Sequence, residues 1–254
     1  MAEPVRIVGS YTSPYVRKVL AVLHLKGIDY RIDSIVPFFG DDRFATASPL
    51  RRIPVYIDES TTPPITLCDS SVICQYLEEA HPSPRLYPVD IAERAEARWL
   101  EEFADTRMGD VIIWRLFNQV AIGPFVWGRP TDKEVVRRVV EEELPSILDY
   151  LESRAPASGY FFGSDVSIAD ISVSTFFRNA AFCRYSIDAA RWPKTAGLVE
   201  RTLALDAFAR LRPFETIGVT TPIPAQREAL LAAGAPLTAE TWGTDRPRPG
   251  VMPT

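Results

Sequence analysis

The pattern of apolar residues changes once along this chain, and that change limits the folds that the chain can adopt. Up to about residue 80, apolar runs of strand length alternate with helical repeats. The proline-rich segment 81–88 interrupts any helix, and from Asp90 onward the pattern is helical only. The sequence therefore predicts an α/β domain over residues 1–81, a linker over 82–89 and an all-α helical bundle after it.

The first part of the α/β domain has the order strand, helix, strand. A short apolar run (5–8) is followed by an amphipathic helix (14–26) and then by a second strand (28–33). In this second strand charged residues alternate with apolar ones, so we expect its charged side, which includes Asp33, to face solvent. Such a unit implies a parallel pair of strands with a right-handed crossover.

The second part of the α/β domain adds two strands and a helix. After a loop over 37–49, strands are expected at 53–57 and 65–68, joined as a hairpin, with a helix over 70–80. The hairpin contributes antiparallel strands to the same sheet. The combined order is thioredoxin-like.

The helical part is predicted to extend over residues 90–221, with 222–254 as a proline-rich extension. Pro145 lies inside one of its helices and is expected to kink it, because proline lacks the N–H group and crowds the preceding turn. The expected helices cover 91–120, 131–154, 167–184, 193–203 and 206–211, with a further short candidate at 225–233. The extension either packs over the cleft of a functional site or is loosely ordered.

The composition excludes several classes of protein. Of the 254 residues 46% are apolar and 24% charged, the balance of an ordinary globular protein, and the net charge of −5 argues against a nucleic-acid partner. No secretory leader is visible, and no apolar run reaches the roughly 18–20 residues of a membrane span. The three cysteines fit neither a disulfide nor a zinc pattern. We expect a cytoplasmic protein with no metal and no membrane partner.

Several short motifs, in this order and spacing, resemble the serine-type branch of the glutathione transferase family. Residues 11–19 are similar to its first loop and helix, and 52–55 to a turn whose proline is cis. Residues 67–73 are similar to the acid–Ser segment that opens its third helix. Ser167–Asp170 matches a capping box of its helical domain, and Trp192–Pro193 a later helix start. Together the motifs span about residues 5–212.

The resemblance implies that Ser13 donates its O–H to the sulfur of glutathione. Lowering a thiol pKa from ~8.5 to roughly 6.5 requires ~2.7 kcal/mol. A charge-assisted hydrogen bond contributes ~1.5–3 kcal/mol, and a helix N-terminus adds ~0.3–1 kcal/mol. One hydroxyl at a helix start therefore suffices. Ser13 is also a plain N-cap candidate, and Ser10, Thr12 and above all Tyr11 compete with it as the activating hydroxyl.

The resemblance also implies a binding path for glutathione. The backbone of Ile53, before cis Pro54, would pair with the cysteinyl part of this peptide. Ser70, at a helix start, would bind the γ-glutamyl carboxylate, and Asp69 the γ-glutamyl ammonium, although the family more often has Glu at that position. Arg52 either faces the glycine carboxylate or is simply solvated.

The remaining expectations concern the second substrate and the alternatives. Trp114, Phe117 and Trp127, with Tyr11, are candidates for a pocket that holds an apolar electrophile, although aromatic residues in such helices are mostly core. Ser167 is expected to be structural. The resemblance implies a homodimeric glutathione transferase that acts on a small electrophile or peroxide. The alternatives are a non-catalytic interaction protein of this fold and a glutathione-dependent isomerase.

Overall fold

A four-stranded sheet forms the centre of the N-terminal domain in the computed structural model of the chain, which describes residues 4–250. Its strands are β1 (Val5–Val8), β2 (Tyr30–Asp33), β3 (Val55–Asp58) and β4 (Ile65–Cys68), in the spatial order β2-β1-β3-β4. β1 and β2 are parallel, and the two other pairs are antiparallel. This confirms the thioredoxin-like arrangement that the strand–helix–strand unit and the hairpin predict.

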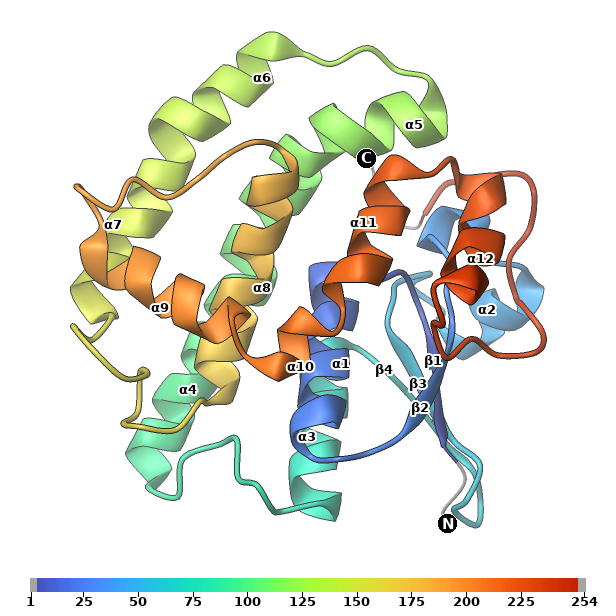
Figure 1. Cartoon of the computed structure of the whole chain (residues 1–254), viewed down its shortest axis with the longest axis horizontal. Helices are drawn as coiled ribbons and strands as arrows, with labels where there is room; N and C mark the ends of the chain where they lie inside the picture. Colours follow the sequence, from blue (N-terminus) through green and yellow to red (C-terminus); the bar gives the residue numbers. More distant parts are fainter. Residues whose placement is uncertain (1–3, 251–254) are drawn as a thin grey trace. The chain divides into compact units, whose positions relative to one another are not determined.

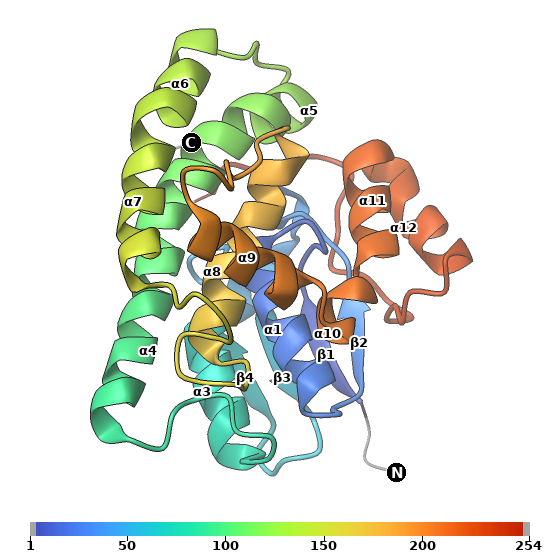
Figure 2. The ribbon, with the colours of Figure 1, turned by 60° about the vertical axis from the view of Figure 1, so that its left-hand side comes forward.

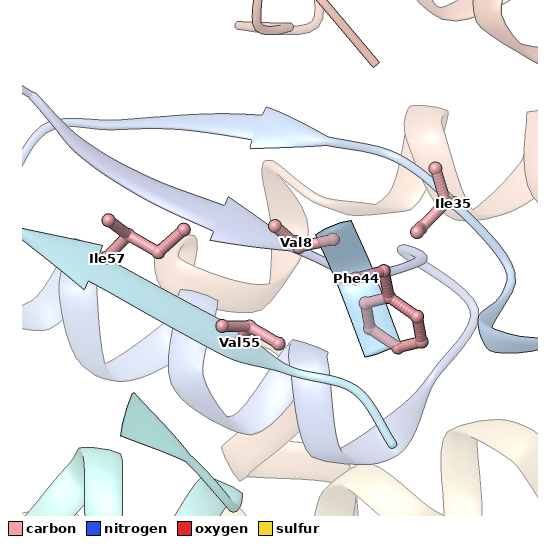
Figure 3. Close-up of a cluster of buried hydrophobic side chains, with 5 residues drawn as sticks. All are labelled: Val8, Ile35, Phe44, Val55 and Ile57. Carbon is pink, nitrogen blue, oxygen red and sulfur yellow. The ribbon is translucent and has the colours of Figure 1, made fainter. Parts of the chain in front are cut away.

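The two faces of the sheet carry different partners because side chains alternate along each strand. One face is covered by α1 (Pro14–Leu25) and α3 (Ser70–Ala80), and Tyr56 of β3 packs against Tyr76 of α3 with ring centroids 5.7 Å apart (Figure 1). On the other face, a hydrophobic cluster combines residues of β1 and β3 with two residues from the connection after β2: Val8, Ile35, Phe44, Val55 and Ile57 (Figure 3).

The segment that the sequence predicts as a plain loop, 37–49, contains two short helices. They are η1 (Pro37–Phe39) and α2 (Asp42–Ala47). Asp41 caps α2 by accepting the Phe44 N–H at 3.0 Å, which is the usual role of Asp before a helix. The helix is too short for a periodic signal, and it forms because fully buried Phe44 inserts into the hydrophobic cluster.

The C-terminal residues belong to the same structural unit as the sheet. One unit runs to Pro84 and resumes at Asp206, and the second runs from Arg85 to Leu205. The sequence-based boundary, by contrast, places 206–221 with the helical domain. After Asp206 the chain forms α10 (Asp206–Ala209), α11 (Arg212–Thr220) and α12 (Ile223–Ala232). α11 has no counterpart among the expected helices, and residues 251–254 of the expected extension lie outside the described residues.

The extension completes the open edge of the sheet. The Ile32 N–H donates to Pro236 O at 2.8 Å and the Thr238 N–H donates to Ile32 O at 3.1 Å, so that Leu237 pairs in parallel with β2. A second bridge joins Gly243 to Gly40. An edge strand would otherwise expose unpaired backbone groups. The described part of the extension is thus built into the unit and is not a loosely ordered tail.

The same packing buries Asp33, which the sequence places on a solvent-facing side. Its carboxylate accepts the backbone N–H of Trp242 at 2.6 Å. The same carboxylate lies 3.7 Å from the Arg6 guanidinium and 3.8 Å from that of Arg227. Arg6 stacks over the Trp242 ring at 4.1 Å. Arg31, on the same side of β2, is exposed as expected. Asp33 departs from the prediction because the extension, distant in sequence, packs over it.

We predict that Trp242→Ala lowers the free energy of unfolding by about 3 kcal/mol, at the lower end of the range for removing a large aromatic residue because Trp242 is half-buried. Urea denaturation measures this. Leu231→Ala is the matched control, since Leu231 lies in the same C-terminal region with 55% of its surface exposed and should change stability by less than about 0.5 kcal/mol. Equal stability of the two variants would contradict a structural role for the extension.

The second unit is helical throughout. α8 (Ile168–Phe182) packs against α4 (Ile91–Phe103), η2 (Ala104–Ile122) and α9 (Pro193–Leu203) (Figure 2). α4 continues directly into η2, whose π-type bonding is seen where the Gly123 N–H reaches Asn118 O, five residues back. The helix expected at 131–154 runs without a break from Lys133 to Arg154. Its hydrogen bonding changes to the π type over Val139–Glu143, just before Pro145 in the first turn of α7 (Leu144–Arg154). Its elements are α4 (Ile91–Phe103), η2 (Ala104–Ile122), α5 (Gly123–Trp127), α6 (Lys133–Arg138), η3 (Val139–Glu143), α7 (Leu144–Arg154), α8 (Ile168–Phe182) and α9 (Pro193–Leu203).

Ser167 and Asp170 form the capping box at the start of α8. Asp170 Oδ2 accepts the backbone N–H of Ser167 at 2.8 Å and its hydroxyl at 2.6 Å, while Oδ1 accepts the Phe161 N–H at 3.0 Å. Burial raises the pKa of Asp170, and these hydrogen bonds lower it in part. The pair therefore joins the 161–167 segment to α8.

Ser167→Ala should lower the free energy of unfolding by about 0.5–2 kcal/mol through loss of the cap. Ser167→Thr keeps the hydroxyl and should stay close to the wild type. Thermal denaturation distinguishes the three proteins. A variant that kept its melting temperature but lost enzymatic activity would show that Ser167 is not merely structural.

Candidate functional site

Three loops leave the sheet at the same end. The strand register places Val8 beside Val55 and Val55 beside Cys68, so that the end of β1, the start of β3 and the end of β4 lie in one row (Figure 3). The loop after β1 carries Ser13, the turn before β3 carries Ile53, and the step after β4 carries Asp69. The sequence-predicted residues of the glutathione site in this unit are therefore brought to one edge by the register alone.

Gly9 allows two of these loops to approach closely. A Cβ atom at this position would lie 3.2 Å from Ile53 Cβ and 2.5 Å from Val16 Cγ2, closer than side-chain atoms normally come. Only glycine fits there without displacement. The loop after β1 therefore runs directly beside Ile53 before it enters α1.

Ser13 is the N-cap of α1. Its backbone is extended, its N–H donates to Ser10 O at 3.0 Å, and its Oγ accepts the Val16 N–H at 3.4 Å. Pro14 follows at the first helical position. Because the cap bond uses Oγ as an acceptor, the Ser13 O–H is still able to donate, from a half-buried position at the positive end of the helix.

Two of the competing hydroxyls bond to each other, and the third is buried. Ser10 Oγ and Thr12 Oγ1 lie 2.8 Å apart and bond to each other, and Ser10 is buried. Tyr11 is only 2% exposed, its ring lies 4.9 Å from that of Phe214, and burial raises its pKa well above the ordinary value. Tyr11 is accordingly an interior residue of this unit.

The turn before β3 contains a cis peptide bond between Ile53 and Pro54. Pairing of β3 with β1 begins at Val55, so the backbone of Ile53 lies before the sheet ladder. Ser48 Oγ fixes this turn by accepting the Arg52 N–H at 3.0 Å and donating to Arg52 O at 2.8 Å. The Arg52 side chain is exposed.

Asp69 and Ser70 stand between β4 and α3. Asp69 has a φ of 80°, which is unusual for a residue with a side chain and costs about 1–3 kcal/mol. Its Oδ1 accepts the N–H groups of Ser71 at 2.9 Å and Val72 at 3.2 Å, so Asp69 caps α3. Ser70 is the first residue of the helix and is 2% exposed.

Two buried cations of α1 belong to this region, and sequence reasoning missed them. Lys18 Nζ donates to Ser71 Oγ at 3.1 Å, near the start of α3. Arg17 forms an ion pair with Glu215 of α11 and also reaches the carbonyl oxygens of Tyr11 at 3.4 Å and Thr12 at 3.5 Å. Both side chains are fully buried. No local pattern could indicate this, because their partners lie on other elements.

The aromatic candidates for a second-substrate pocket lie in the helical unit, apart from Tyr11. Trp114 and Phe117 are half-buried on η2, with the Phe117 ring 6.5 Å from that of Phe182, and Trp127 ends α5. Within residues 4–250 no group of acidic, histidine or cysteine side chains is arranged to hold a metal ion. Nor does any helix of that part of the chain have the length and hydropathy needed to cross a bilayer.

Comparisons with known proteins agree with this architecture. Family models match the glutathione S-transferase N-terminal domain over residues 7–85 and the C-terminal domain over residues 93–201. The uncharacterized GST-like protein YibF of Escherichia coli is 29% identical, covering 82% of this chain and 98% of YibF. Maleylacetoacetate isomerase of Mus musculus is 27% identical, over 77% of this chain and 86% of the isomerase.

A solved structure is also similar. A glutathione S-transferase of Methylobacterium radiotolerans, in complex with glutathione sulfonate, has a TM-score of 0.67 and 24% sequence identity. The match covers 82% of this chain and 94% of the other. At this identity the likeness concerns the fold.

Proposed function

The chain belongs to the glutathione S-transferase family, and from that membership we propose that it is a serine-type glutathione transferase. In this proposal Ser13 activates the glutathione thiol, which then attacks a small apolar electrophile or reduces a peroxide. The observation that carries the proposal is the position of Ser13 at the start of α1, with its hydroxyl able to donate while its oxygen caps the helix.

The physical basis is stabilisation of a thiolate. A hydrogen bond from Ser13 to the sulfur, together with the positive end of α1, supplies about the 2.7 kcal/mol that lowers the thiol pKa by roughly two units. The thiolate then donates an electron pair to the electrophile, a carbon–sulfur bond forms, and the leaving group departs with the displaced pair. Holding both reactants together contributes the remaining acceleration.

Glutathione is proposed to lie along the three loops in extended form. The backbone of Ile53 pairs with its cysteinyl part, the start of α3 at Ser70 receives the γ-glutamyl carboxylate, and Arg52 reaches the glycine carboxylate. Lys18, which donates to Ser71, adds positive charge near the proposed position of the γ-glutamyl carboxylate. Because Asp69 caps α3 through Oδ1, Oδ2 is the oxygen proposed to accept from the γ-glutamyl ammonium.

Ser13→Ala should retain glutathione binding but lose thiol activation. The thiol pKa of bound glutathione should return toward the free value of ~8.5, which at pH 7 reduces the thiolate fraction by about 20- to 30-fold. Ultraviolet absorbance of the thiolate and calorimetric titration measure the two effects. Ser13→Thr, which keeps a hydroxyl, is the control, and absence of glutathione binding by the wild type would favour the non-catalytic alternative.

Tyr11→Phe separates the two hydroxyls that the sequence left in competition. Because the Tyr11 side chain is buried against Phe214, its hydroxyl is not expected to reach the sulfur. The thiol pKa of glutathione bound to this variant should equal that of the wild type within about 0.3 units. A return of the thiol pKa to its free value would transfer the activating role from Ser13 to Tyr11.

A glutathione-dependent isomerase is the second candidate, supported by the likeness to maleylacetoacetate isomerase. In an isomerase glutathione adds to the substrate and leaves again, so free thiol is not consumed. In a transferase one thiol disappears for each product formed. Incubation with maleylacetoacetate and, separately, with a panel of aromatic halides, with free thiol measured in each, distinguishes the two activities.

A further inference from the structure

We propose that Glu215 is a positioning residue for Ser13, and that α11 as a whole holds the loop Ser10–Ser13, called here the Ser13 loop. The inference rests on the proposed role of Ser13 and concerns how its hydroxyl is kept in place. α11 begins at Arg212, beyond residue 201 where the match to the family models ends.

The first contact is the buried ion pair between Arg17 and Glu215. Glu215 accepts from Arg17 Nε, while Nη2 of the same guanidinium donates to the carbonyl oxygens of Tyr11 and Thr12. A guanidinium is planar and rigid, so fixing one edge fixes the other. Glu215 thereby orients the group that holds the backbone of the Ser13 loop.

The second contact is steric. A Cβ atom on Gly218 would lie 2.5 Å from Thr12 Cγ2, so α11 approaches the loop as closely as a bare backbone allows. Glycine inside a helix is otherwise unfavourable compared with alanine. Its presence here is explained by the space that Thr12 occupies.

The third contact is aromatic. The ring of Phe214, the residue before Glu215, lies 4.9 Å from the ring of Tyr11. Tyr11 and Thr12 of the Ser13 loop thus contact two positions on α11 directly, and Glu215 acts on the loop through Arg17. α11 and the loop belong to the same unit, and α11 is labelled in Figure 1. These contacts leave the loop little freedom to shift along or away from α11.

The position of the loop determines the position of the Ser13 hydroxyl. Ser13 follows Thr12 directly, and its N–H is bound to Ser10 O within the same turn. Displacing Thr12 therefore displaces Ser13. A misplacement of about 1 Å between a catalytic group and its substrate can reduce the rate by about 100-fold.

The test is a pair of complementary substitutions, Gly218→Ala and Thr12→Ser. Gly218→Ala places a methyl group against Thr12 Cγ2 and should raise the thiol pKa of bound glutathione and lower kcat/KM by about tenfold or more. Thr12→Ser removes Cγ2 but keeps the hydroxyl that bonds to Ser10, and is the reference protein. The double variant should recover the pKa and kcat/KM of Thr12→Ser.

Two further measurements make the outcome independent of folding and of the chemistry. In Gly218→Ala the gain in helix propensity and the steric clash with Thr12 act on stability in opposite directions, so the melting temperature of each variant is measured. A changed thiol pKa in a variant that is still folded at the assay temperature reports position rather than unfolding. Amide hydrogen exchange of residues 10–13 should be faster in Gly218→Ala and in Glu215→Gln, and should return to the reference rate in the double variant.

The results separate the proposed positioning role of α11 from the proposed activating role of Ser13. If the wild type lowers the thiol pKa but Gly218→Ala changes neither that pKa nor the loop exchange, the positioning role is wrong. The positioning role is also wrong if the double variant does not recover the thiol pKa and kcat/KM of Thr12→Ser. If the wild type binds glutathione without lowering its thiol pKa, the role of Ser13 fails, while the loop exchange still decides whether α11 holds the loop.

Discussion

A buried guanidinium on the first helix determines much of the architecture around the candidate site. Arg17 is fully enclosed, and a charge in the protein interior is stable only with a counter-charge and hydrogen-bond acceptors. The nearby sequence supplies the acceptors, the carbonyls of Tyr11 and Thr12, but the counter-charge comes from Glu215, nearly 200 residues later. The return of the chain to its first unit at Asp206 is therefore an electrostatic requirement of α1 as well as a matter of apolar packing.

The structure also shows how single side chains at the site serve two purposes. Ser13 and Asp69 are both helix caps, and both are among the residues that the family resemblance assigns to glutathione. A cap fixes the side chain through short backbone bonds and leaves part of its hydrogen-bonding capacity directed away from the helix. Sites built this way are preorganised, since the helix start holds the group in place before any ligand arrives.

The sequence predicts those features that depend on neighbouring residues. The strands, α1 and the capping box of Ser167 and Asp170 are predicted correctly, because the apolar periodicity, helix caps and prolines that indicate them lie within a few residues of one another. What it missed depends on distant partners. Asp33 alternates as an exposed residue would, yet it is buried where the C-terminal extension, through the Trp242 backbone and Arg227, packs against it. α11 is short, has Pro213 as its second residue, and contacts Arg17 and Thr12, which lie far away in the sequence. The same locality left Ser13 and Tyr11 in competition as the activating hydroxyl, because the sequence does not show that Tyr11 packs against Phe214.

The pairing of Leu237 with β2 has a consequence for the order in which the chain can fold. Domains generally fold from the N-terminus during synthesis, but here the N-terminal unit is discontinuous, and its edge strand and Asp33 await residues 237–242, which are made after the whole helical unit. The continuous unit from Arg85 to Leu205 contains all of its own segments before those residues are made. On the ribosome, the unit that is translated first is thus completed after the unit that follows it, and its unpaired strand edge remains open to other chains until Leu237 is available to pair with β2.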